Sequence, residues 1–138
     1  MALVDKIWAI AQTPGNEQGF TIDLNRMRMC TDEGFCVAYA ATQNRHGYDD
    51  LRDVVLPHAQ GANGSKIIGG WYNNGDNQYY FDSIKVYTTR AAAVTAAKMA
   101  EQIGIYDLRT QNYIPIMDAV TGSFNPSLPA TRARSHSI

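Results

Sequence analysis

The residues of this 138-residue chain that are best suited to chemistry are two aspartates in apolar runs and one loop histidine. Asp82 interrupts an aromatic run, and strand alternation places it on a partly buried face. Asp107 has a similar setting, whereas His46 lies in a loop between a predicted strand and a predicted helix. Since a buried carboxylate needs a partner, each aspartate either caps a neighbouring loop or pairs with an arginine such as Arg52, Arg90 or Arg109, or the two form a site together. His46 is either a solvated loop residue or an acid/base or ligand-binding group.

A second group of candidates combines glycines with aromatic rings. Gly69 and Gly70 interrupt a predicted strand just before Trp71, where glycine lowers stability unless a bulge or a close backbone approach requires it. One interpretation is a β-bulge that curves a hairpin over a helix. The other is a flat aromatic surface, made by Trp71 with Tyr72 or Tyr79, that stacks a base or a sugar. The candidate ligand-binding residues are therefore Gly69, Gly70, Trp71, Tyr72, Tyr79, Asp82, His46 and Asp107.

The motifs of the most recognisable enzymes are missing from the chain. It has no G-x-S-x-G, no P-loop, no H-E-x-x-H and no H-x-E with P-C-x-x-C. Cys30 and Cys36 lack both C-x-x-C spacing and a second pair of ligands, so they are predicted to be free thiols in a reducing compartment. We therefore expect no metal, no cofactor and no catalytic residue of these kinds. An enzyme with a dispersed site remains an alternative.

Charge and hydropathy narrow the range of partners. Twelve basic and thirteen acidic residues give a net charge of −1, which supplies no field to collect duplex nucleic acid. The first residues do not form a signal peptide, and no apolar run approaches the roughly 18 residues of a membrane span. The sequence thus predicts a cytoplasmic protein that binds neither duplex nucleic acid nor a membrane.

Hydrophobic periodicity predicts the elements that must position these side chains. Helical spacing is expected over 2–12, over 48–56 up to Pro57, and over 90–103 between a Thr88 or Thr89 N-cap and Gly104. The clearest strand signal is a hairpin, residues 66–72 and 78–87 around Asn74-Gly75, with Gly75 expected at positive φ. The remaining strands are expected at 20–24, 35–40, 105–108 and 112–116.

These elements predict one α+β domain over residues 1–116, followed by a Pro- and Ser-containing tail over 117–138. The order is α-β-β-α-β-β-α-β with a short last strand. The strands at 20–24 and 35–40 are expected to pair across the segment Cys30–Gly34. The fold is then a single, mainly antiparallel sheet with the helices packed on one face.

Three sequence strings together resemble a known set of proteins. They are Gly19-Phe20-Thr21-Ile22-Asp23-Leu24 followed by Val37-Ala38-Tyr39, then Gly69-Gly70-Trp71-Tyr72 with Tyr79-Tyr80-Phe81-Asp82-Ser83, then Ile105-Tyr106-Asp107-Leu108 after an alanine-rich helix. This pattern resembles small uncharacterised proteins of bacteriophages, prophages and conjugative elements, over about residues 19–114. The resemblance implies a mobile-element origin and no particular mechanism.

Three functions are compatible with the sequence. The first is a phage or mobile-element accessory protein that captures a host protein or a nucleotide-like small ligand, for example to counter host defence. The second is a structural virion protein of capsid or tail, localised to the virion and assembled through homo-oligomeric or virion contacts. The third is a small nuclease or transferase with a dispersed site, built from His46, Asp82, Asp107 and an arginine.

Overall fold

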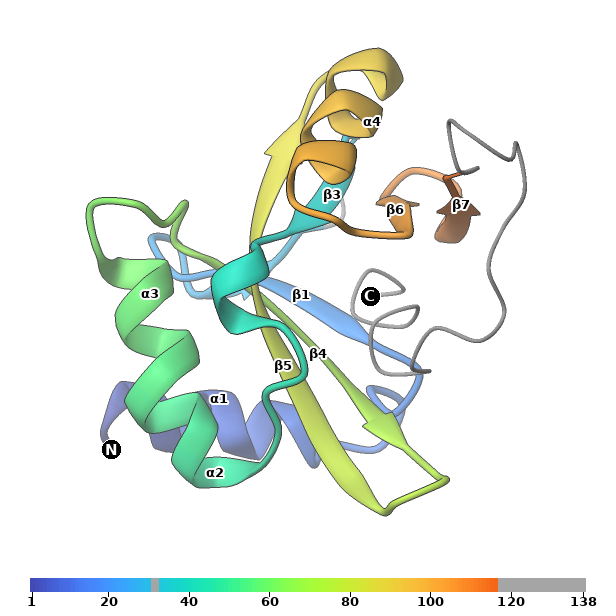
Figure 1. The fold of residues 1–138 in the computed structure, drawn as a ribbon. Helices are drawn as coiled ribbons and strands as arrows, with labels where there is room; N and C mark the ends of the chain where they lie inside the picture. Colours follow the sequence, from blue (N-terminus) through green and yellow to red (C-terminus); the bar gives the residue numbers. More distant parts are fainter. Residues whose placement is uncertain (31–32, 117–138) are drawn as a thin grey trace.

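The computed structural model describes residues 1–30 and 33–116, so the tail predicted over 117–138 lies outside the described residues. The described chain forms an α+β fold around one curled antiparallel sheet of seven strands, as the sequence predicts (Figure 1). The strand order is β2-β1-β4-β5-β3-β6-β7. The strands are β1 (Phe20–Asp23), β2 (Arg28–Met29), β3 (Phe35–Ala38), β4 (Ile67–Asn73), β5 (Gln78–Tyr87), β6 (Gly104–Asp107) and β7 (Asn112–Pro115).

The helices cover one face of this sheet, here called the helix face. Helix α1 (Leu3–Ala11) and helix α3 (Leu56–Gln60) pack on β1, β4 and β5 in a cluster centred on Phe81. Helix α4 (Arg90–Met99) packs its small residues Ala93 and Ala97 against β3 and β6. The opposite side of the sheet, here called the groove face, carries the alternate side chains of every strand.

The second helical segment runs through its proline instead of ending there. It consists of α2 (Gly47–Asp50), a π-helical turn (Leu51–Val55) and α3, and Pro57 lies in the first turn of α3. The prediction that Pro57 ends this helix is therefore wrong. A π turn widens the backbone spacing ahead of the proline, which lowers the clash of its ring with the preceding turn.

Strand β1 does not pair with β3, contrary to the sequence prediction. Instead, β1 pairs with β4 on one side and with the two-residue strand β2 on the other. Strand β3 pairs with β5 and β6. The ten-residue strand β5 binds β4 with its first half and β3 with its second half, so β4 and β5 lie between β1 and β3.

The β4–β5 hairpin is present as predicted, but its turn has a different geometry. Its strands pair in continuous register from Ile68 opposite Ser83 to Asn73 opposite Gln78. Residues 74–77 form a four-residue loop in which the left-handed residue is Asn77 (φ 59°), whereas Gly75 does not have the predicted positive φ. The carbonyl of Asn73 accepts a hydrogen bond from the Asn77 N–H at 2.8 Å, and this bond fixes the loop.

Helix α4 begins as predicted and ends early. Thr89 is its N-cap, since the hydroxyl accepts a hydrogen bond from the Ala92 N–H at 3.2 Å. The helix ends at Met99 rather than at residue 103, and Glu101 (φ 57°) takes the left-handed conformation expected of Gly104. Gly104 instead begins β6, where a side chain would collide with the ring of Tyr113 on β7. In the part of the chain that the structure describes, no helix is long and apolar enough to cross a membrane.

Candidate functional site

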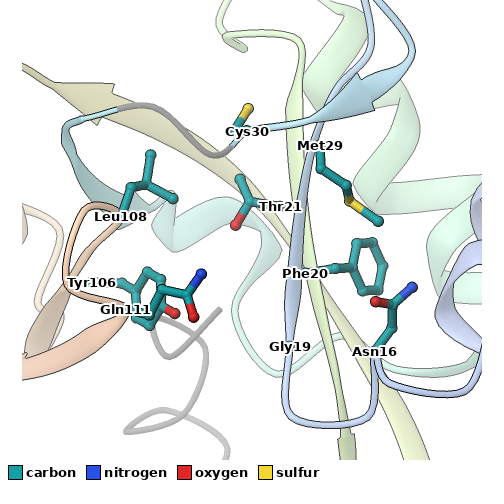
Figure 2. Close-up of a pocket in the computed structure, with 9 residues that line it drawn as sticks. All are labelled: Asn16, Gly19, Phe20, Thr21, Met29, Cys30, Tyr106, Leu108 and Gln111. Atoms are coloured by element: carbon teal, nitrogen blue, oxygen red, sulfur yellow. The ribbon is translucent and has the colours of Figure 1, made fainter.

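The sheet curls so that a groove forms on the groove face, between β1–β2 on one side and β6–β7 on the other (Figure 2). Figure 2 shows Thr21 pointing from β1 toward this groove, whereas Phe20 points away from it. Tyr106 and Gln111 reach it from the β6–β7 side. The groove therefore lies between two strand pairs, β1–β2 and β6–β7, that are far apart in the sequence.

The groove consists of two pockets that share Gly19, Tyr106 and Gln111. The inner pocket has a volume of about 180 Å³, and the outer pocket has a volume of about 620 Å³. The inner pocket is lined by Asn16, Gly19, Phe20, Thr21, Met29, Cys30, Tyr106, Leu108 and Gln111. The outer pocket is lined by Gly15, Glu17, Gln18, Gly19, Tyr72, Asn74, Tyr106, Gln111 and Tyr113.

The chemical character of the groove is polar, aromatic and nearly uncharged. Among the described residues that line it, Glu17 carries the one charge, and no lysine or arginine is present. The amide of Gln111 combines donors with an acceptor, and the ring of Tyr106 adds a flat apolar surface, whereas the amide of Asn16 already donates to the Ile10 carbonyl at 2.9 Å. This combination suits a small uncharged ligand that is planar and forms hydrogen bonds.

A row of three residues crosses the groove face beside the inner pocket. Thr21 on β1 lies opposite Gly69 on β4, and Gly69 lies opposite Asp82 on β5. All three positions point to the groove face, because their neighbours Phe20 and Phe81 pack on the helix face. Since Gly69 has no side chain, β4 places no side-chain atoms between the Thr21 hydroxyl and the Asp82 carboxyl.

Asp82 is the most unusual side chain of this row. It is 1% exposed, and its Oδ2 has no hydrogen-bond partner among the described residues. Removal from water raises the pKa of Asp82 well above its usual value, because burial penalises the charged form. The buried hydroxyl of Thr21 also lacks a partner within the described chain. Two buried polar groups that lack partners are costly, at about 1–3 kcal/mol each.

The two strand glycines have different roles, and neither marks a bulge. The pairing of β4 with β5 is continuous through Gly69 and Gly70, so the bulge interpretation is wrong. A Cβ at Gly70 would lie 2.5 Å from Cε1 and Cζ of Phe20. Gly70 is therefore required by close packing on the helix face, as the alternative of a close approach predicts.

Trp71 is buried against Tyr80 and does not line the groove. It is 3% exposed, and its ring stacks on that of Tyr80 with centroids 4.9 Å apart and planes 17° apart. The exposed His46 ring lies next, 5.0 Å from the Tyr80 ring, while its backbone N–H donates to Asp50. These three rings form a row on the groove face. His46 lines neither pocket of the groove.

Tyr72 and Tyr79 lie on the other side of β4 and β5 from Trp71. Their rings contact each other at 4.8 Å, and Tyr79 also contacts Trp8 of α1 at 5.4 Å. An aromatic surface made by Trp71 with either tyrosine is thus excluded by strand alternation. Tyr72 nevertheless lines the outer pocket, together with Asn74 of the hairpin loop.

Asp107 is separated from Asp82 by the sheet itself. It points to the helix face, since it lies opposite Phe35, whose ring packs in the α4 cluster. Its carboxylate accepts a hydrogen bond from the Arg109 N–H at 3.0 Å and so caps the β6–β7 turn. The structure therefore does not bring Asp82, Asp107 and His46 together, and no described arginine forms an ion pair with Asp82.

The residues that sequence reasoning missed are Thr21, Tyr106 and Gln111, together with the inner-pocket residues Asn16 and Cys30. Four of them are ordinary strand or loop residues in the sequence, and Cys30 was considered only as a thiol. Their common wall exists only because β1 and β6, four places apart in the strand order, curl toward each other. Strand alternation puts Thr21 on the face opposite to Phe20 and Tyr106 on the face opposite to Ile105. No local sequence pattern indicates that the Thr21 face of β1 and the Tyr106 face of β6 line one groove.

The comparisons with known proteins add no family to this geometry. No protein-family model matches the chain, and no curated protein or solved structure shows significant similarity to it. Within residues 1–30 and 33–116, no three His, Cys, Asp or Glu side chains are grouped so that they could hold a metal ion.

Proposed function

We propose that this protein is a small-ligand binding protein whose groove takes an uncharged, planar molecule of the nucleobase or nucleoside kind. The observation that carries the proposal is the inner pocket, which is lined by the amide of Gln111, the hydroxyl of Thr21 and the ring of Tyr106 (Figure 2). Amides read the donor and acceptor groups of a base, and a tyrosine ring stacks on its face. The volume of about 180 Å³ fits one ring system and not a whole nucleotide.

The charge of the groove lining favours a nucleoside over a nucleotide in this proposal. A phosphate group is normally held by arginine, lysine or a helix N-terminus. The described lining residues of the groove contain none of the two basic types, and Glu17 in the outer pocket would repel a phosphate. We therefore expect a nucleoside to bind more tightly than its 5′-monophosphate.

The biological setting that we propose is that of a phage or mobile-element accessory protein. Its support is the resemblance of the strings at 19–24, 37–39, 69–72, 79–83 and 105–108 to proteins of such elements. A ligand-capturing protein of this kind lowers the free concentration of a host-derived small molecule without needing a catalytic group.

The test uses Cys30, which lines the inner pocket and is partly exposed, as a reporter of occupancy. The full chain is alkylated with iodoacetamide in the presence of adenosine, guanosine, cytidine or uridine, and labelling is followed by intact-protein mass spectrometry. We expect at least one nucleoside to slow alkylation of Cys30 and to give a saturable heat of binding by calorimetry.

Two controls make the measurement specific. The 5′-monophosphate of the same nucleoside should protect Cys30 less, because of Glu17. The variant Tyr106→Ala should lose protection by about tenfold or more, since one base stacked on an aromatic ring contributes about 1–3 kcal/mol. If all four nucleosides leave both the alkylation rate and the calorimetric baseline unchanged, the proposed function is wrong.

A further inference from the structure

We propose that the outer pocket holds the ribose of the ligand and that Glu17 accepts hydrogen bonds from the 2′- and 3′-hydroxyl groups of that ribose. On this assignment the groove selects ribonucleosides over 2′-deoxyribonucleosides. The inference rests on the proposed function of the groove and extends it from the base to the sugar. Base and sugar occupy different pockets, so the two assignments can be tested separately.

The continuity of the two pockets is the first support. They share the lining residues Gly19, Tyr106 and Gln111, so a base that stacks on Tyr106 in the inner pocket already touches the boundary of the outer one. Gly19 adds no side chain at this boundary. The inner pocket, at about 180 Å³, has room for one ring system, whereas the outer pocket has about 620 Å³. The sugar bonded to the base therefore lies in the outer pocket.

The lining of the outer pocket is the second support, because it combines flat rings with polar groups. Tyr106 on β6 lies opposite Tyr113 on β7, so their side chains are neighbours on one face of the sheet, and Tyr72 lines the same pocket. Amide side chains complete the polar part of the lining, namely those of Gln18, Asn74 and Gln111. Rings of this kind contact the C–H face of a sugar, while amides and a carboxylate pair with its hydroxyl groups.

The fixed position of Glu17 is the third support. Its Oε2 accepts a hydrogen bond from the Gly15 N–H at 2.9 Å, which orients the carboxylate. Its backbone carbonyl accepts a hydrogen bond from the Tyr72 N–H, also at 2.9 Å, which attaches the loop after α1 to β4. Glu17 is thus held by two other residues of the same pocket. An acceptor that is in place before the ligand arrives loses little conformational freedom on binding.

The chemistry of a carboxylate explains the choice of a diol. An ionised carboxylate accepts about four hydrogen bonds and donates none. The Gly15 N–H uses one of these positions on Glu17, and no described lysine or arginine forms an ion pair with it. The remaining acceptor positions suit two neighbouring O–H donors, which the cis 2′,3′-diol of ribose supplies. A 2′-deoxyribose has lost one of the two donors.

The test uses calorimetry on the full chain with the best-binding nucleoside of the four and its 2′-deoxy counterpart. Wild type should bind the ribonucleoside at least about fivefold more tightly, since the deoxy sugar lacks one hydrogen bond to a charged acceptor. Glu17→Gln keeps one carbonyl oxygen for the Gly15 N–H but has no second acceptor oxygen, so the preference should fall to within about twofold. Glu33→Gln changes an exposed acid that lines neither pocket of the groove, and this matched control should keep the wild-type preference.

A ligand-side measurement on the wild-type chain needs no variant. The arabinonucleoside of the same base keeps both hydroxyl groups but places the 2′-hydroxyl on the opposite face of the sugar ring. The proposal expects at least about a fivefold loss of affinity, because the two donors no longer reach one carboxylate. Equal affinity for the ribonucleoside and the arabinonucleoside contradicts the assignment of the diol to Glu17.

The outcomes separate this inference from the proposed function. If the ribonucleoside protects Cys30 from alkylation and the 2′-deoxyribonucleoside binds equally well, the groove binds the base but does not read the ribose. If Glu17→Gln keeps the full preference for the ribonucleoside, another residue reads the sugar and the role of Glu17 is overturned. If no nucleoside protects Cys30, the proposed function fails and this inference fails with it.

Discussion

Thr21 and Asp82 lie on either side of Gly69 in one row across three strands, and both are buried without a partner for their side-chain oxygens in the described chain. This arrangement stores an electrostatic cost in the middle of the sheet. Such costs are typical of binding and catalytic sites, where a ligand can supply the missing hydrogen bonds. It also makes the stability of the protein depend on pH in a way that can be measured.

The first prediction concerns Asp82 and pH. Its pKa is raised in the folded state, so between its ordinary value of 3.8 and that raised value the folded chain holds a proton that the unfolded chain has lost. Stability contributed by the neutral acid is complete below about pH 4 and is lost as pH rises. Asp82→Asn cannot titrate, so its stability advantage over wild type should grow with pH, by up to about 1.4 kcal/mol per unit.

Urea unfolding of both proteins at pH 4, 6 and 8 measures this difference. Asp107→Asn is the control and should not reproduce the trend, because the Asp107 carboxylate caps a turn on the helix face. A difference between Asp82→Asn and wild type that stays constant over this range would contradict the assignment of a neutral buried acid.

The second prediction concerns the requirement for glycine at position 70. Gly70→Ala places a Cβ 2.5 Å from the Phe20 ring and 3.2 Å from Phe81 Cδ1, in the core beneath α1. Overpacking of this kind costs about 1–3 kcal/mol. Gly75→Ala is the control, because its Cβ meets only the Asn73 side chain, at 3.1 Å, in an exposed loop. Thermal melts should show a clear loss for the first variant and a much smaller one for the second.

The third prediction concerns the hairpin loop. Asn77 holds the left-handed conformation, so Asn77→Gly should be neutral or slightly stabilising. Asn77→Val should cost about 1–2 kcal/mol, since a β-branched side chain is strained at this φ. Denaturant unfolding of the two variants measures the contrast. Equal stability of the glycine and valine variants would show that the loop does not hold this geometry in solution.

The fourth prediction concerns the two thiols, which differ in burial and in pKa. Cys36 is fully buried, and burial raises its pKa above the ordinary thiol range, so it has almost no reactive thiolate. Cys30 is partly exposed at the inner pocket. Brief alkylation of the native protein should therefore add one label, at Cys30, and alkylation in denaturant should add two. Peptide mapping that finds Cys36 labelled as fast as Cys30 would contradict this burial.

The sequence alone determined the class of the fold and most of its elements. Period-two alternation is a local property, so it correctly placed Asp82 on the same buried face as Tyr80 and Ile84, and it located the β4–β5 hairpin. The N-cap at Thr89 was also readable, because its hydrogen bond spans only three residues. The predicted helix end at Pro57 and the predicted positive φ at Gly75 are wrong, because a π turn and a four-residue loop relieve the local constraints that these residues usually impose.

The tertiary structure decided which strands are neighbours and therefore where the groove lies. The pairing of β5 with both β4 and β3, and the curl that brings β1 toward β6, depend on contacts between residues far apart in the chain. Alternation states which side chains share a strand face, but it does not state which faces meet. Trp71 stacks on Tyr80 because alternation and the hairpin register put both on one face, whereas Thr21 became part of a site only when the curl of the sheet brought β1 toward β6.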